Sequence, residues 1–281
     1  MRTKTQPADS IAFALARHVV LGLGAVLMLA PFVLMVSVSL KPPGEIFSPD
    51  FTLLPKVWHA VENYSAAFSR QPLARFILNG FIVTGAIFFF QLIVALPAAY
   101  ALAKLRWQGR ETVFLMVLLG LLIPHQVTAI PLYILFWKFG LIDTYAAIIL
   151  PSTISVFGIF LMRQFFLTVP DDLINAARLD GLGEFAIVWR IMMPTAVPAV
   201  ISFGVLSLVW NWNEFFWPLI VIQSEHLATP PLGVVFFNNA EAGTNYGPLM
   251  AAATAITAPL VIAFLAAQRW FIDGVTMTAV K

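Results

Sequence analysis

The chain consists of long apolar segments separated by polar ones, and this pattern limits the folds that it can adopt. A helix needs about 20 mainly apolar residues to cross about 30 Å of hydrocarbon. The segments of suitable length cover approximately residues 18–40, 76–103, 113–137, 145–167, 197–222 and 248–268. Because backbone polar groups must be satisfied internally in lipid, we predict an all-α membrane protein with six transmembrane helices in one membrane domain, 1–281.

Composition and charge support this class. Of the 281 residues, 60% are hydrophobic and 11% are charged, which excludes an ordinary soluble domain. Lys and Arg lie at segment ends rather than in one cluster, so no nucleic-acid partner is expected. They are more frequent in the segments that an inside N-terminus would place in the cytoplasm, which predicts that both termini are cytoplasmic. The sequence has no Cys, so this chain has no thiolate metal site or cysteine nucleophile.

Two further features concern the spans themselves. The first apolar run is too long for a signal peptide, so it is interpreted as a retained first span. Proline occurs inside several segments, and membrane helices tolerate it where neighbours satisfy the freed carbonyl groups. Pro124, Pro131 and Pro218 are expected to bend their helices.

The polar interval 168–194 carries clear signals for a short helix. Thr168 and Asp171 have the spacing of a capping box, and Gly181 is a natural helix stop. We therefore predict a helix over 171–179. A helix this short is marginal alone in water, so it should depend on packing. Ala176 and Ala177 offer a small apolar surface that a groove could approach closely.

A set of residues in this interval resembles the EAA loop of bacterial ABC importer permeases, whose pattern is Glu-Ala-Ala, three residues, Gly, nine residues, Ile-x-Leu-Pro. The matching residues are Asn175, Ala176, Ala177, Gly181, Ile191, Met193 and Pro194. Two positions depart from the pattern: Asn175 replaces Glu and Met193 replaces Leu. The first departure removes a charge that could pair with a basic residue of a partner ATPase.

In that family the EAA loop is the coupling helix, which docks in a cleft of the ATPase. The resemblance therefore implies an ATPase-docking site formed by Asp172, Asn175, Ala176, Ala177, Arg178, Asp180 and Gly181. The alternative is a solvated connector between two membrane helices.

Shorter stretches along the chain resemble carbohydrate-importer permeases of the maltose type (MalG-like). They are AAYALAKLRWQGR from Ala98, GLIDT from Gly140, WNEFFWPL from Trp212 and QRWFIDGVTMTAVK from Gln268. The resemblance implies the type I ABC importer permease fold, a multi-pass location in the bacterial inner membrane and a carbohydrate substrate. It also implies a second homologous permease subunit, which favours a heterodimer, two copies of a cytoplasmic ATPase and a periplasmic solute-binding protein.

Catalysis finds no support in the sequence. The phosphate loop Gly-x-x-x-x-Gly-Lys-Ser/Thr is absent, so ATP and Mg are expected on the partner ATPase and no cofactor in this chain. His18, His59, His125 and His226 show no metal-ligand spacing, so neither a metal site nor catalytic residues are expected. We interpret His125, beside Pro124, as a hydrogen-bonded core histidine.

The fifth apolar segment contains the second candidate site, for the translocation path or the substrate. Its residues are Trp210, Asn211, Asn213, Glu214 and Trp217. An ionisable group inside a span costs about 2.5–3.5 kcal/mol, so Glu214 should face the bundle interior or water. Asn211 and Glu214 are three residues apart, so we expect them to share one helix face. Substrate contact and a structural or gating role at a subunit interface both remain open.

Two other classes of protein make different sequence predictions. An ion-coupled secondary transporter should carry coupling carboxylates in several spans and an inverted repeat, and neither is visible. A membrane-embedded enzyme should carry a clustered His/Asp/Glu set at one membrane face. The ATP-driven permease therefore remains the preferred interpretation.

Overall fold

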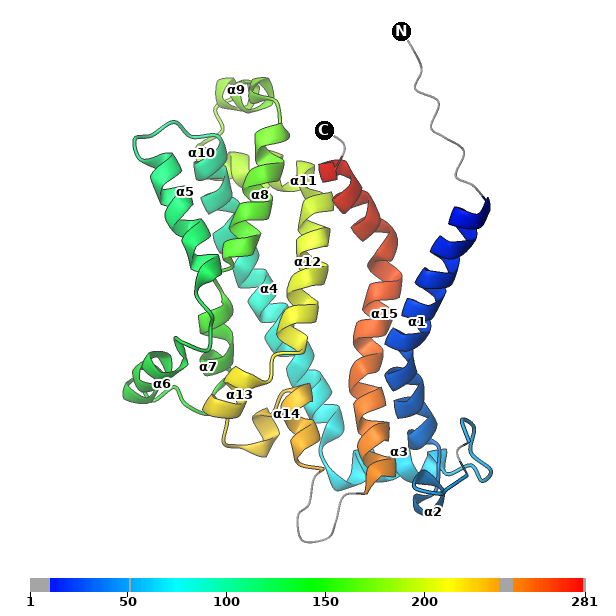
Figure 1. Cartoon of the computed structure of the whole chain (residues 1–281). Helices are drawn as coiled ribbons and strands as arrows, with labels where there is room; N and C mark the ends of the chain where they lie inside the picture. The colour runs from blue at the N-terminus through cyan, green and yellow to red at the C-terminus, as the bar shows by residue number, and fades with distance from the viewer. Residues whose placement is uncertain (1–10, 51, 238–244, 280–281) are drawn as a thin grey trace. The chain divides into compact units, whose positions relative to one another are not determined.

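The structure is a computed structural model that describes residues 11–50, 52–237 and 245–279 (Figure 1). The described residues form helices and connecting segments, with no β-strand among them. The predicted all-α class is therefore confirmed. The chain divides into two compact units, Met1–Arg70 with Phe237–Thr254 and Gln71–Phe236 with Ala255–Lys281.

The first unit contains α1 (Ile11–Ser39), α2 (Pro43–Ile46), α3 (Ala60–Arg70) and the start of α15 (Tyr246–Ala279). The buried side chain of Asn63 in α3 donates to the carbonyl oxygens of Ser39 at 3.0 Å and Lys41 at 2.9 Å. Gly247 packs so closely on Asn63 that an added Cβ would lie 2.5 Å from the Asn63 Oδ1 atom. Asn63 therefore joins three elements of this unit.

The second unit is built on α4 (Leu73–Ala103), which packs against α8 (Val156–Thr168) and α12 (Val197–Trp212), as Figure 1 shows. Its other elements are α5 (Arg110–Leu119), η1 (Gly120–Leu122), α6 (Ala129–Lys138), α7 (Tyr145–Ile149), η2 (Leu150–Ser152), α9 (Asp171–Leu179), α10 (Glu184–Ile187), the π-helical turn η3 (Val188–Met192), α11 (Met193–Thr195), α13 (Phe216–Val221), η4 (Glu225–Leu227), α14 (Pro230–Val235) and the later part of α15. A core of buried apolar side chains from α4, α8, α9, α10, η3 and α12 holds the interval 168–194 in place.

Among the described helices, three are long and apolar enough to cross a membrane alone. They are Phe13–Ser39, Leu73–Ala103 and Tyr246–Ala266. Tyr145–Ser152 with Val156–Thr168, bent by 41°, and Glu184–Thr195 with Val197–Trp212, bent by 83°, could each make one broken span. This gives up to five spans by length and composition, so the count of six stays a prediction.

The segment 113–137, predicted as one span with bends at Pro124 and Pro131, is interrupted rather than bent. α5 and η1 end at Leu122, and no α-helix resumes before Ala129. Ile123 is extended, with φ −88° and ψ 112°. Proline disfavours the helical region for the residue before it, so Pro124 accounts for this break. Pro131, expected to bend a helix, lies instead in the first turn of α6, where a missing N–H is tolerated.

The segment 197–222, predicted as one span with a bend at Pro218, is also interrupted. α12 ends at Trp212 and α13 begins at Phe216. The ring of a proline clashes with the carbonyl group four residues earlier in a continuous helix. Pro218 would meet Glu214 in this way, so the helix stops and restarts.

Gly158 provides a test of the packing between α8 and α12. A Cβ at this position would lie 2.6 Å from the ring of Phe203, which is itself buried. We expect Gly158→Ala to lower the free energy of unfolding by about 1–3 kcal/mol, since a packed ring cannot move aside. Gly85→Ala is the matched control, because nothing lies within 4 Å of its added Cβ. Thermal unfolding in detergent should separate the two variants, and equal stabilities would contradict this packing.

Candidate functional site

The predicted short helix is present with the predicted bounds, as α9 (Asp171–Leu179). Gly181 has φ +81°, a conformation that favours glycine. The N–H of Gly181 donates to the Arg178 oxygen and that of Leu182 to the Ala177 oxygen, both at 3.0 Å. This is a Schellman motif, so Gly181 terminates the helix as expected.

The start of α9 differs from the prediction. Thr168 does not cap the helix, because it is the last residue of α8 and its hydroxyl donates to the Phe165 oxygen at 2.7 Å. Pro170 occupies the N-cap position, without a side-chain hydrogen bond. The capping-box prediction is therefore wrong, and α9 gains its N-terminal support from elsewhere.

That support is Lys104, at the end of α4. Its Nζ atom donates to the Asp171 Oδ1 atom and to the Val169 oxygen, each at 2.6 Å. The Lys104 side chain is 7% exposed and that of Asp171 is 66% exposed, so the ion pair joins a buried amine to a surface carboxylate. The hydrogen bond and the charge of Lys104 lower the pKa of Asp171 below its ordinary value. The first turn of α9 is thereby fixed to the end of α4.

The last turn of α9 is held through Glu184 of α10. Arg178 donates to Glu184 through Nε at 2.8 Å and through a terminal nitrogen at 3.2 Å. The hydroxyl of Tyr100, a buried residue of α4, donates to the same carboxylate. The hydrogen bond to Glu184 raises the pKa of Arg178. Both ends of α9 are therefore connected to α4.

The two faces of α9 differ in what they contact. Ile174 and Ala177 point inward and are 2% and 4% exposed, within the core shared with α4 and α8. The prediction that Ala177 offers a surface to a partner is therefore wrong, because it faces the core of its own chain. The outer face carries Leu173, Ala176 and Leu179, and Leu179 is 89% exposed.

The other residues predicted for docking lie on exposed positions. They are Asp172, Asn175, Ala176, Arg178, Asp180 and Gly181. Sequence reasoning missed Leu179. The signal was present, since Leu173, Ala176 and Leu179 recur every three residues and so share one helix face.

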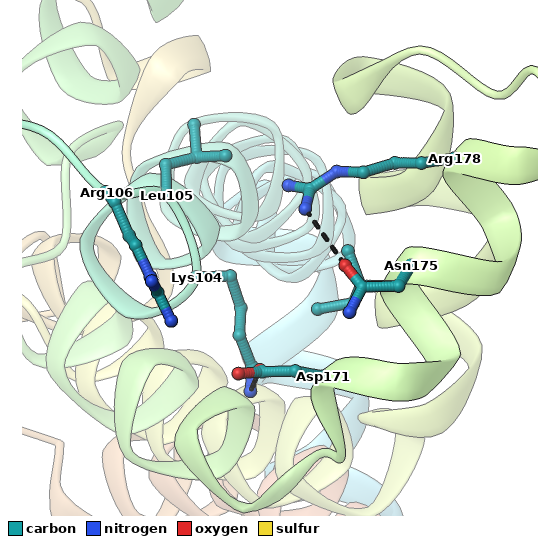
Figure 2. A pocket seen from close by; sticks show the side chains of 7 residues that line it. Lys104, Leu105, Arg106, Asp171, Asn175 and Arg178 are labelled. Carbon is teal, nitrogen blue, oxygen red and sulfur yellow. Dashed lines mark hydrogen bonds and ion pairs between the residues drawn. The ribbon is translucent and has the colours of Figure 1, made fainter.

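A pocket of about 430 Å³ lies between the inner edge of α9 and the end of α4 (Figure 2). Its lining residues are Lys104, Leu105, Arg106, Asp171, Ile174, Asn175 and Arg178. Figure 2 shows Arg106 on one side and Asn175 with Arg178 on the other. Arg178 donates to the Asn175 side-chain oxygen at 3.4 Å. The lining is rich in hydrogen-bond donors and positive charge.

A second candidate site lies where the two chain breaks meet. His125, in the break after Pro124, approaches Glu214, in the break after α12, with 3.8 Å between Nε2 and Oε2. The other carboxylate oxygen of Glu214 accepts the Trp217 N–H at 3.0 Å. The His125 ring lies 6.3 Å from that of Trp210. His125 is 47% exposed, so its interpretation as a core histidine is wrong.

The remaining predicted path residues separate into two kinds. Asn211 donates to the Ser207 oxygen at 2.8 Å, and the Ser207 hydroxyl donates to Gln91 of α4 at 2.6 Å. Trp217 is buried and donates its indole N–H to the Ala147 oxygen at 2.8 Å. Trp217 therefore joins α13 to α7, whereas Asn211 bonds within its own helix to the residue that contacts α4. Asn211 and Glu214 do not share a helix face, because α12 ends between them.

Trp210 and Asn213 are exposed. Trp210 is 65% exposed, and the amide of Asn213 donates to the Val209 oxygen at 2.8 Å. Together with His125 and Glu214, they form the accessible part of this second site. Among the described residues, no three His, Asp or Glu side chains gather as a metal ligand set.

Comparison with known proteins places these features in a family context. Residues 91–277 match the family model described as binding-protein-dependent transport system inner membrane component. The chain is 34% identical to a probable ABC transporter permease protein of Bacillus subtilis, over 89% of this chain and 83% of the relative. It is 32% identical to the arabinooligosaccharides transport system permease protein AraQ of Halalkalibacterium halodurans, over the full length of both.

Two further likenesses agree. The sn-glycerol-3-phosphate transport system permease protein UgpE of Yersinia pestis is 31% identical, over 92% of this chain and 94% of the relative. A solved bacterial ABC transporter involved in the import of the acidic polysaccharide alginate has a chain with TM-score 0.83 and 23% identity, covering 96% of this chain and 100% of that one. At that identity the likeness shows the fold alone.

The connection from α9 to α4 can be tested at Tyr100. Tyr100→Phe removes one hydrogen bond to a carboxylate, worth about 1.5–3 kcal/mol. We expect amide hydrogen exchange in α9 to become about tenfold faster or more, while membrane insertion is unchanged. Tyr64→Phe, which removes a tyrosine hydroxyl 3.3 Å from Ser39, is the control. Unchanged exchange in Tyr100→Phe would contradict the connection.

Proposed function

The chain belongs to the family of binding-protein-dependent transport system inner membrane components, and on this premise we propose that it is the permease subunit of an ABC importer for a carbohydrate or carbohydrate derivative. The relatives named for arabinooligosaccharides and sn-glycerol-3-phosphate support this substrate class, since the first solute is a carbohydrate and the second is a phosphate ester of a small polyol. The family consists of transport components rather than enzymes.

We propose six spans with both termini in the cytoplasm, in one membrane domain. The three long helices and two bent pairs supply five crossings, and the interrupted segment 110–138 supplies the sixth. Non-helical backbone at membrane depth is tolerated where it is buried in protein or lines a water-filled cavity. We therefore place the non-helical segment 123–128 beside the transport path and not against lipid.

α9 is the coupling helix in this proposal. The observation that carries the proposal is that one face of α9 is buried in its own chain and the opposite face is exposed. One face packs in the core of the chain and both ends are bonded to residues that contact α4, while the opposite face exposes Leu173, Ala176 and Leu179. The exposed face docks on the ATPase. The bonded ends pass its movement to α4.

The partners follow from this role. Two copies of a cytoplasmic ATPase hold ATP and Mg, a second homologous permease completes the membrane bundle, and a periplasmic solute-binding protein delivers the carbohydrate. When ATP closes the ATPase pair, α9 moves with it and α4 follows. The bundle then opens outward, which is the alternating-access step.

The solute passes beside the two chain breaks. A carboxylate at membrane depth must be hydrated, paired or covered by protein. His125 and Glu214 supply groups that can hydrogen-bond sugar hydroxyls, and the exposed indole of Trp210 supplies an apolar ring face. In the second interpretation these residues contact the other permease subunit instead. An ion-coupled secondary transporter is not favoured, because the family model describes a binding-protein-dependent transport system and one relative is named as a probable ABC transporter permease.

Docking can be tested at Leu179. Leu179→Asp places a charge on the most exposed apolar residue of α9, and loss of a central contact typically costs more than about 2 kcal/mol. We expect recovery of the ATPase in co-purification to fall about tenfold or more, with insertion retained. Leu54→Asp, at another exposed leucine (69%), is the control. If the ATPase co-purifies with Leu179→Asp at the wild-type yield, α9 is not part of the interface with the ATPase.

The path can be tested at Glu214. Glu214→Gln retains shape and hydrogen bonding but removes the charge, and Glu214→Leu removes both. We expect solute uptake by the reconstituted complex to fall in the order wild type, Gln, Leu, while ATPase assembly is retained. Normal uptake by Glu214→Leu would show that Glu214 lies neither on the transport path nor at the interface with the second permease. Failure of both variants to assemble with the second permease would identify Glu214 as an interface residue.

A further inference from the structure

The pocket between α9 and the end of α4 has more cations than carboxylates among its lining residues. Its lining has three cations, Lys104, Arg106 and Arg178, against one carboxylate, Asp171. Lys104 is paired with Asp171, and Arg178 with Glu184 just outside the lining. Within the described part of the chain, Arg106 forms no hydrogen bond or ion pair. Arg106 therefore has no direct partner, although its charge acts on Asp171 at longer range and helps to lower the pKa of that carboxyl group.

The hydrogen-bonding groups around this cation are mainly donors. A guanidinium group has five N–H donors and no acceptor. Asn175 accepts the bond from Arg178 with its oxygen, which leaves its NH₂ group without a hydrogen bond among the described residues. Arg106 and this NH₂ group line the same pocket (Figure 2). A group that fits between them must accept hydrogen bonds and carry negative charge.

Asn175 is the position where the EAA pattern has Glu. A Glu side chain there would occupy the pocket and could neutralise its excess charge from within. With Asn, the pocket stays open and positive. Asn175 thus leaves at this edge of α9 a positive charge that a Glu at the same position could cancel.

We propose that the pocket receives a carboxylate side chain of the ATPase partner, held by Arg106 and the amide of Asn175. The inference rests on the proposed docking role of α9, since the pocket lies along the edge of that helix. In this arrangement the permease provides the cation and the ATPase the carboxylate, the reverse of the pairing that a Glu at position 175 would make. Planar guanidinium groups suit carboxylates because they can bond both oxygens at once.

The first test is ATPase binding by Arg106→Gln and Asn175→Glu. Affinity for the purified ATPase is measured with permease complexes in nanodiscs of neutral lipid. We expect Arg106→Gln to weaken binding about threefold to tenfold, and to reduce the loss of affinity that added salt causes. Asn175→Glu should also weaken binding, because its own carboxylate fills the pocket. Arg190→Gln removes an exposed arginine outside the pocket and should bind as the wild type does.

The second test identifies the carboxylate. Each Asp and Glu on the docking surface of the ATPase is changed to Lys and combined with Arg106→Glu. One reversed pair should recover most of the binding that Arg106→Glu loses.

Several outcomes would overturn the proposal. If Asn175→Glu strengthens binding, the partner supplies a base at this contact. If Arg106→Gln weakens binding only when anionic lipid is present, the pocket binds a lipid headgroup. If no reversed pair restores binding, no ATPase carboxylate enters the pocket. The docking role of α9 is tested independently by Leu179→Asp. If that variant loses ATPase binding, the docking role is supported whatever the pocket binds. If that variant binds the ATPase normally, the docking role is contradicted.

Discussion

The attachment of α9 to α4 by polar bonds at both ends is the interaction on which the functional account depends. A nine-residue helix is only marginally stable alone in water, and α9 has no side-chain cap at its start. Lys104 holds its first turn, and Glu184 joins its last turn to Tyr100. The core beneath Ile174 and Ala177 fixes its rotation. A helix held in this way can transmit a displacement, whereas a loosely tethered one would absorb it.

Prolines give the chain its second defining feature, which is helix interruption within apolar segments. Pro124 and Pro218 each prevent a continuous helix, for different local reasons: one restricts the residue before it, and the other clashes with a carbonyl group one turn back. The two interruptions meet at His125 and Glu214. Exposed backbone and ionisable groups have a high free-energy cost in lipid. The place where the two interruptions meet therefore suits a water-accessible path better than a lipid-facing surface.

The sequence predicted local features well and tertiary ones less well. The bounds of α9 and its stop at Gly181 depend on neighbouring residues, so they were predictable. Which face of α9 is buried depends on α4 and α8, and Ala177 was therefore assigned to the wrong side. His125 and Glu214 are far apart in sequence, so their contact could not be predicted. Trp217 and Asn211 looked like solute contacts because residue type does not reveal that their polar atoms are already bonded.

The most direct test of the central claim replaces the Lys104–Asp171 bond with a covalent one. The chain has no Cys, so the pair Lys104→Cys and Asp171→Cys provides its only thiols. Solute uptake by the reconstituted complex is measured before and after a short bifunctional thiol reagent joins the two positions. The account predicts that uptake falls in the unbridged variant and returns when the bridge forms, since α9 and α4 then move together again. Wild-type uptake without the bridge, or no recovery with it, would contradict the claim.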